Sequence, residues 1–206
     1  MTRLTLILVI VATAVASSAV TSAFWFVAFN RGAIAHEAPA APAQPAKAAG
    51  PRARLVVAPS GLAIPVVGVR PEQLVDTYTA ARSGGRVHDA NDIMAARGTE
   101  VVAAAPGTVE KLFFSHGGGG ITAYVRSPDG QWQYYYAHLD SYWLGLHEGQ
   151  AVKQGDPIGR VGSTGDASPD APHLHFAVNR MQPGERWWQG TPVNPYPLLA
   201  GKKAGQ

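Results

Sequence analysis

The sequence contains no cysteine. A disulfide framework, a thiolate metal site and a cysteine nucleophile are therefore excluded. The absence of cysteine does not indicate whether the protein works in a reducing or an oxidising compartment, because an extracytoplasmic protein can simply avoid thiols. Strong helical periodicity is also scarce, whereas the 206 residues include 23 glycines and 16 prolines. This composition favours strands joined by turns over a helical domain.

Most of the chain also lacks an excess of positive charge, although the net charge is +3. Residues 1–54 hold five Lys/Arg against one Glu, a balance of +4, and residues 55–206 hold 12 Lys/Arg against 13 Asp/Glu, a balance of −1. The basic isoelectric point thus comes from the N-terminal segment. Because the remainder carries no basic stripe, we expect no nucleic-acid partner.

One long hydrophobic run stands near the N-terminus. Residues 4–29 are 26 positions without a charge, and a helix of that length can cross about 30 Å of hydrocarbon with some tilt. A cleaved signal peptide is the alternative, with Arg3 before the run and the small residues "AVA" at 14–16 as the cleavage site. Because the run exceeds an ordinary signal core, we predict that residues 1–31 anchor the chain in a membrane.

Three further segments follow the hydrophobic run. Residues 32–54 form an Ala/Pro-rich linker without the large apolar side chains that a core requires. Residues 55–200 alternate β-branched or aromatic runs with glycine-containing turns, and "SPDG" at 127–130 is a strong hairpin signal. We expect a mostly β, antiparallel domain with little helix there, followed by a short tail at 201–206.

The stretch "PHLHFAV" at 172–178 places two histidines in an apolar run. On a strand, His173 and His175 project to one face, while Leu174 and Phe176 point to the other. Two neighbouring imidazoles indicate a metal site, or one ligand beside an acid–base group. Alone, the pattern fits equally well two half-buried histidines bonded to backbone carbonyls.

The stretch "VHDAND" supplies another imidazole and a carboxylate. His88 and Asp92 are four residues apart, a spacing that shares one face on a helix and also on an extended segment. Asp89 is a competing carboxylate, but its odd offset turns it away from His88 on a strand. A neutral imidazole with a carboxylate suits Zn²⁺.

A further histidine ends the aromatic run "YYYAH". Even spacing predicts that Tyr134 and Tyr136 share the face of His138 and that Tyr135 does not. A histidine in this position is either a structural residue or a general base.

Together these segments predict a catalytic metal site. His88, Asp92 and His175 make three protein ligands, and a fourth position is left for water, which is the pattern of a catalytic zinc. One zinc ion per chain would lower the pKa of that water towards about 7. His138 and His173 remain for work beside the metal, where they would take the proton of the water or stabilise the oxyanion.

Four stretches, at 86–109, 134–139, 148–167 and 172–178, resemble in this order the lysostaphin/LytM-type zinc metallopeptidases. The resemblance extends over about residues 62–198. It implies an antiparallel β-sheet related to barrel-sandwich hybrid hairpins, with the site in a groove on one face. Residue by residue it implies the ligands His88, Asp92 and His175 and the catalytic residues His138 and His173, and it identifies no substrate-binding residue.

The same resemblance implies the function. Members of this family are peptidoglycan endopeptidases, so we expect zinc-dependent hydrolysis of peptide cross-bridges in the bacterial cell wall. The alternative is a non-enzymatic member of the fold that activates another cell-wall hydrolase. With the predicted anchor, the domain would act outside the cytoplasm in the cell envelope, or be secreted after signal cleavage. Two departures stand out: Ala90 replaces the usual glycine, and Asn91 replaces an apolar residue.

Overall fold

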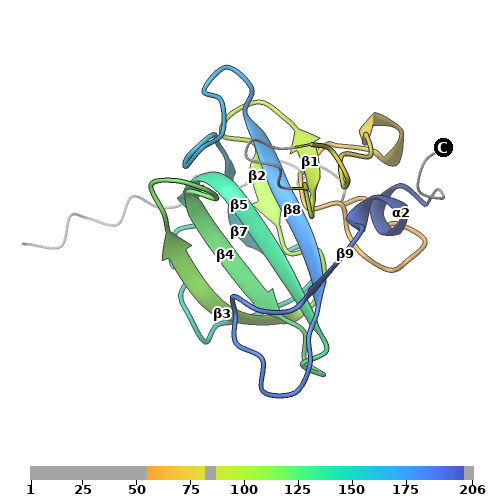
Figure 1. Cartoon of the computed structure of the whole chain (residues 1–206), viewed down its shortest axis with the longest axis vertical. Helices are drawn as coiled ribbons and strands as arrows, with labels where there is room; N and C mark the ends of the chain where they lie inside the picture. Colours follow the sequence, from red (N-terminus) through yellow and green to blue (C-terminus); the bar gives the residue numbers. More distant parts are fainter. Residues whose placement is uncertain (1–54, 82–86, 202–206) are drawn as a thin grey trace, which may run out of the picture. The chain divides into compact units, whose positions relative to one another are not determined.

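The computed structural model describes residues 55–81 and 87–201 (Figure 1). The predicted anchor at 1–31 and the predicted linker at 32–54 lie outside the described residues, as do 202–206 of the predicted tail. Within the described ranges, no helix is long and apolar enough to cross a membrane. The anchor therefore stays a prediction.

The described domain is built on antiparallel β-sheet, as predicted (Figure 1). Six strands lie side by side in the order β1 (Asn91–Met94), β8 (His173–Arg180), β5 (Trp132–Tyr142), β4 (Ile121–Arg126), β3 (Gly107–Phe114) and β6 (Ala151–Val152). Off this path, β9 (Thr191–Val193) pairs with β8, and β7 (Pro157–Val161) pairs with both β5 and β2 (Glu100–Val102).

Helix is scarce in the described part of the chain, which also agrees with the prediction. It is limited to the 3₁₀ turn η1 (Pro71–Gln73) and the short α2 (Pro195–Ala200). The side chain of Asn194 caps α2 by accepting the N–H of Tyr196 at 2.9 Å, and Gly201 ends the helix in the left-handed region (φ 65°).

The predicted hairpin at "SPDG" joins β4 and β5. The N–H of Ser127 donates to the carbonyl of Trp132 at 2.9 Å, and the N–H of Gly130 donates to the carbonyl of Ser127 at 2.9 Å. Gly130 has φ 71°, a conformation that glycine adopts without a Cβ collision. The hairpin fixes the register of β5, the central strand of the site.

Strand β8 alternates as its sequence predicted. Leu174 and Phe176 are fully buried in the core, whereas His175 is half-buried on the opposite face. The core packs the buried faces of the strands together, with Tyr136, Phe176, Ile93, Leu139, Ile158 and Leu174 among its largest fully buried side chains. The histidine face of β8 is thereby left for the site.

Strand β5 changes partner at His138. Residues 132–137 pair with β8, and the strand pairs with β7 from Leu139 onward. His138 lies between them with φ 57°, the only positive φ of a non-glycine residue in the described ranges. A left-handed backbone costs an ordinary residue about 1–2 kcal/mol, and such residues concentrate at functional sites.

This backbone reversal overturns one expectation from the sequence. Tyr134 and Tyr136 do not share the face of His138: both are buried in the core. Tyr135 lies on the same side as His138 and lines the same cavity. The even-spacing rule failed because it assumes an uninterrupted extended strand, and the left-handed residue breaks the alternation at His138.

Candidate metal centre

Strand pairing brings two of the predicted ligands together. In the register of β1 and β8, Asp92 stands directly opposite His175, and the Asp92 Oδ1 to His175 Nδ1 distance is 3.1 Å. His88 comes from the segment before β1, where its N–H donates to the carbonyl of Ala80 at 3.0 Å. The i,i+4 pair is thus neither on one helix nor on one strand, because the chain turns between His88 and β1.

Three ligand atoms meet at this point. The distance from His88 Nε2 is 3.0 Å to His175 Nδ1 and 3.1 Å to Asp92 Oδ1, and all three atoms lie within 4.8 Å of one another. A tetrahedral zinc with ligands at about 2.0–2.1 Å separates its ligand atoms by about 3.3–3.4 Å. The distances and the donor set, two imidazoles and a carboxylate, therefore fit a zinc ion. Asp89 is not part of this group.

Thr77 contacts two of these three predicted ligands. Its carbonyl oxygen lies 2.6 Å from His88 Nδ1, and because a carbonyl only accepts, we assign the imidazole proton to Nδ1 and the lone pair to Nε2. Its hydroxyl oxygen accepts the N–H of Asp92 at 2.9 Å. No sequence pattern marks Thr77, which is 11 residues from His88 and 15 from Asp92.

The two other predicted site histidines stand beside the ligands. His173 Nδ1 lies 2.8 Å from the carbonyl of Ala171, and His138 Nδ1 lies 2.8 Å from the carbonyl of Thr164. Each Nδ1 therefore donates, and each Nε2 keeps a lone pair. The ring of His138 is 5.0 Å from that of His173 and 5.5 Å from that of His175, centroid to centroid. His173 Nε2 is 3.7 Å from Asp92 Oδ1.

The surroundings favour neutral imidazole and ionised carboxylate. Burial lowers the pKa of His138, and the neighbouring His175 and His173 lower it further, against the effect of the Thr164 carbonyl. Burial alone would raise the pKa of Asp92, but the hydrogen bonds and charges of His175 and His88 outweigh it and hold that pKa far below its usual value. An ionised carboxylate is the form in which Asp92 can bind a metal, and a neutral imidazole is the form in which His138 can accept a proton.

A glycine-rich wall supports His138. Thr164, whose carbonyl accepts from His138, also donates its hydroxyl to the carbonyl of Leu139 at 2.7 Å and accepts the N–H of Ile121 at 2.9 Å. A Cβ on Gly120 would collide with Thr164, and Gly120 itself has φ 65°. Gly118 and Gly120 of the "GGGG" run thus pack closely against the loop that carries Thr164 and Gly165.

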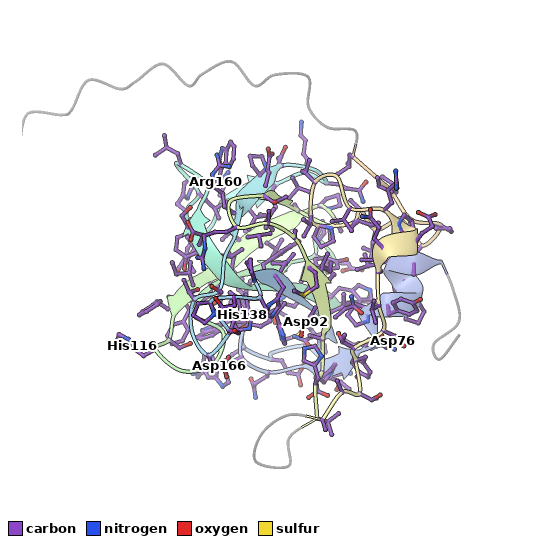
Figure 2. The ribbon with its side chains drawn as sticks, turned by 90° about the horizontal axis from the view of Figure 1, so that it is seen from above. Asp76, Asp92, His116, His138, Arg160 and Asp166 are labelled. Carbon is purple, nitrogen blue, oxygen red and sulfur yellow. The ribbon has the colours of Figure 1, made fainter. Side chains whose placement is uncertain are left out.

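The cluster opens onto a cavity of about 460 Å³. Its walls are Val87, His88, Asp89, Gly118, Gly119, Tyr135, His138, Asp166 and His175. In Figure 2, His138 and Asp166 lie close together in this part of the domain with Asp92 beside them, whereas Arg160 lies apart. Arg82 and Arg86, which precede the first motif, lie outside the described residues.

This fold and site define a class of peptidase. The sequence model of peptidase family M23 matches residues 86–195, more than half of the chain, and the chain belongs to this family. The predicted relationship to lysostaphin and LytM, the predicted fold and the predicted enzyme class are thereby confirmed.

Particular relatives show the same relationship. The chain is 32% identical to the L-Ala–D-Glu endopeptidase of Bacillus subtilis over 121 residues, which are 56% of this chain and 35% of that protein. It is 36% identical to an uncharacterised metalloprotease of Haemophilus influenzae over 121 residues, 58% of this chain and 23% of that protein. The chain therefore spans about a third or less of these curated relatives.

Solved structures agree with the described fold. Lysostaphin from Staphylococcus simulans, an antimicrobial peptidase, is 30% identical with a TM-score of 0.53, covering 65% of this chain and 53% of that one. A LytM protein from Ruminococcus gnavus is 33% identical with a TM-score of 0.52, covering 62% of this chain and 52% of that one.

Proposed function

We propose that this chain is a zinc-dependent endopeptidase that hydrolyses peptide cross-bridges of bacterial peptidoglycan. The observation that carries the proposal is the group of His88 Nε2, Asp92 Oδ1 and His175 Nδ1, which meets beside a cavity open to a substrate. The Bacillus subtilis relative is named for cleaving a bond to D-Glu, and peptides that contain D-amino acids are characteristic of the cell wall. That name supports peptidoglycan peptides as the substrate class.

In this proposal, the three ligands hold one zinc ion. When bound, the ion would supply Lewis-acid chemistry that polarises the scissile carbonyl and lowers the pKa of a water molecule. The ligand set leaves room for such chemistry because it offers three protein atoms rather than four. Thr77 keeps two of the ligands in their binding orientation.

His138 and His173 move protons in this proposal. Each Nε2 has a lone pair, so one ring takes the proton of the attacking water as its oxygen bonds to the carbonyl carbon. The same proton passes to the leaving nitrogen when the C–N bond breaks. The other ring would balance the negative charge that develops on the carbonyl oxygen only when it is protonated, because Nε2 then carries a hydrogen that it can donate.

Tyr135 adds a neutral hydrogen-bond donor to the same cavity. Burial raises the pKa of its hydroxyl, and the neighbouring Tyr124 raises it further, so the hydroxyl keeps its proton at neutral pH. A neutral hydroxyl beside a developing oxyanion stabilises it by donation.

We further propose that the domain acts in the cell envelope. Residues 1–31 would anchor the chain, and residues 32–54 would extend at most about 70 Å at polyproline II rise. This reach would keep the catalytic domain near its own membrane, where it would remodel the wall of the organism itself. Secretion after signal cleavage is the alternative arrangement.

Defined muropeptides test the function. The purified full chain, loaded with zinc, should release cleaved peptides detectable by mass spectrometry, and a chelator should abolish the release. His175→Ala should abolish it too, whereas His147→Ala, which changes an exposed histidine outside the ligand group, should not. A zinc-loaded chain that cleaves nothing but activates another wall hydrolase would favour the regulatory alternative.

A further inference from the structure

A series of aromatic rings leads away from the metal centre. The ring of Tyr135 lies 5.9 Å from that of His175, the ring of Tyr124 lies 4.6 Å from that of Tyr135, and the ring of Trp187 lies 4.9 Å from that of Tyr124. Trp188 then lies 5.2 Å from Trp187. Tyr124, Trp187 and Trp188 offer no metal ligand and have no part in the proposed chemistry at the metal, so that chemistry does not explain their presence.

The rings line a second hollow that joins the first. This cavity measures about 280 Å³, and it shares Asp89, Tyr135 and His175 with the cavity of the metal centre. Its remaining walls are Tyr124, Ala177, Asn179, Trp187, Trp188, Gln189 and Pro192. A molecule bound there would therefore lie immediately beside the site of hydrolysis.

The structure fixes the two tryptophans rather than leaving them on a loose loop. The carbonyl of Trp187 accepts from Gln133 Nε2 at 3.0 Å, and Gln133 is fully buried. Two residues earlier, the carbonyl of Glu185 accepts from Arg126 at 3.2 Å. Arg126 is itself held by two hydrogen bonds to the carboxylate of Glu110, at 2.8 and 2.9 Å.

The exposure of these rings points to a ligand. Trp188 is 56% exposed, and Trp187, Tyr124 and Tyr135 are half-buried. Large aromatic side chains gathered at a surface mark binding sites, because each buries a large apolar area once a partner covers it. The rigid support of the loop means that little ordering is required on binding.

The composition of the walls selects the chemistry of that ligand. Aromatic faces pack against flat arrays of C–H groups, while Asn179 and Gln189 offer amide hydrogen bonds at the edge. None of the described residues that line the two cavities is Lys or Arg, and Asp89 and Asp166 are acidic. The nearby Arg186 guanidinium lies 5.2 Å from the Trp188 ring centroid, where it stacks on that ring. This environment disfavours a polyanion and suits a neutral, amphipathic ring that carries hydroxyl and amide groups.

We propose that the hollow between Tyr124, Trp187 and Trp188 is a subsite for an N-acetylated sugar ring of the glycan strand. The inference rests on the proposed function, since the glycan carries the peptides that the metal centre would cleave. Successive ring steps of 4.6 to 5.9 Å separate Trp187 from His175, and an extended residue spans about 3.3–3.6 Å. A sugar bound in this hollow would thus lie within a few peptide residues of the scissile bond.

Paired substrates test the subsite. The full chain is given one muropeptide with its disaccharide and the same peptide after the disaccharide has been removed. We expect kcat/KM to be higher for the sugar-bearing form, chiefly through a lower KM. Trp188→Ala and Trp187→Ala should reduce that preference about tenfold, which corresponds to about 1.4 kcal/mol.

A matched aromatic variant controls for general effects. Trp143 packs under the guanidinium of Arg160 and lines neither cavity, so Trp143→Ala should leave the preference unchanged. If Trp188→Ala lowered kcat/KM equally on both substrates, the hollow would bind the peptide rather than the sugar, and the proposal would be overturned. No preference in the wild-type chain would overturn it as well.

A binding measurement separates this proposal from the proposed function. In the Asp92→Ala chain, which should not hydrolyse anything and keeps every wall of the hollow, titration with an N-acetylglucosamine oligosaccharide should still change the tryptophan fluorescence. The change should disappear in Asp92→Ala/Trp188→Ala. Binding without any hydrolysis by the wild-type chain would sink the proposed function and keep the subsite, whereas hydrolysis without binding would do the reverse.

Discussion

His138 and His173 face each other from strands β5 and β8 with their ring centroids 5.0 Å apart, and each donates its Nδ1–H to a backbone carbonyl. Both rings are therefore held in the same tautomer by the main chain alone. Neither needs a metal ion to be oriented, in contrast to His175, whose Nδ1 belongs to the ligand group. This difference separates the two histidines of β8 into two roles that can be measured independently.

His175→Ala should lose zinc, and His173→Ala should keep zinc but lose turnover. Removing a ligand should weaken zinc binding by more than the tenfold to hundredfold typical of residues that only support ligands. Removing an acid–base group should lower kcat by about 10²–10⁴-fold. Zinc content by elemental analysis and kcat on a muropeptide give both readouts. Equal zinc loss in the two variants would show that His173 also binds the metal, contrary to the role proposed for it.

Thr77→Val should weaken zinc binding without removing a ligand. The variant keeps the carbonyl that orients His88 but loses the hydroxyl that accepts the N–H of Asp92. We expect about a tenfold rise in the zinc dissociation constant, measured by competition with a chelator. Thr108→Val, an exposed position on β3, is the control and should bind zinc normally. An unchanged constant in Thr77→Val would mean that the hydroxyl does not position Asp92.

Gly120→Ala should damage both stability and turnover. Its φ of 65° costs an alanine about 1–2 kcal/mol, and the new Cβ would collide with Thr164, which orients His138. Gly130→Ala is a matched control, because Gly130 has φ 71° but no atom within 4 Å of a new Cβ. Urea unfolding should show a lower free energy of unfolding for both variants, and kcat should fall only for Gly120→Ala. If kcat fell equally in Gly130→Ala, the collision with Thr164 would not be the cause of the lost turnover.

Asn91→Leu should stabilise the domain. Asn91 is fully buried in β1, and neither polar atom of its side chain has a hydrogen-bond partner among the described residues. An unpaired buried amide costs about 1–3 kcal/mol, so an apolar side chain of similar shape should raise the free energy of unfolding by about 1 kcal/mol. Equilibrium unfolding in urea measures the change.

Gln133 provides the opposite case for the same experiment. Its amide is equally buried, but its Nε2 donates to Glu110 at 3.1 Å and to the carbonyl of Trp187 at 3.0 Å. Gln133→Leu should therefore destabilise the domain, because it removes both hydrogen bonds and takes the Gln133 donor away from the Trp187 carbonyl, whereas Glu110 keeps its bonds to Arg126. If both substitutions destabilise to the same extent, Asn91 has a partner that its surroundings do not reveal.

Local patterns predicted much of the fold and the ligand group. The two-residue period of β8 placed His173 and His175 on one face and Leu174 and Phe176 on the other, because that strand is regular from end to end. The turn signal at "SPDG" correctly predicted the β4–β5 hairpin, because such a turn depends on neighbouring residues alone.

What the sequence missed depends on irregular backbone and on distant contacts. Tyr135 reaches the cavity in regular register, opposite Ala177 of β8. The left-handed backbone of His138 brings His138 to the same cavity, and alternation rules cannot anticipate such a residue. Thr77 and Thr164 each accept a histidine N–H through the backbone carbonyl, a group that every residue type has. Thr77 also uses its hydroxyl, which serine could supply equally well, so neither contact leaves a pattern in the sequence. The row of rings from Tyr135 to Trp187 combines two strands with a loop, and only the folded chain brings them together.

The pairing of Asp92 with His175 also ties together parts of the chain that are 83 residues apart. The proposed metal-binding group does not form until β1 has docked on β8, so an unfolded chain offers no such site and zinc binding would favour the native state. At a free zinc concentration one hundred times the dissociation constant, this linkage would add about 2.7 kcal/mol to the free energy of unfolding. The ion would then hold β1 against β8, and the zinc concentration would determine the stability of the domain as well as its activity.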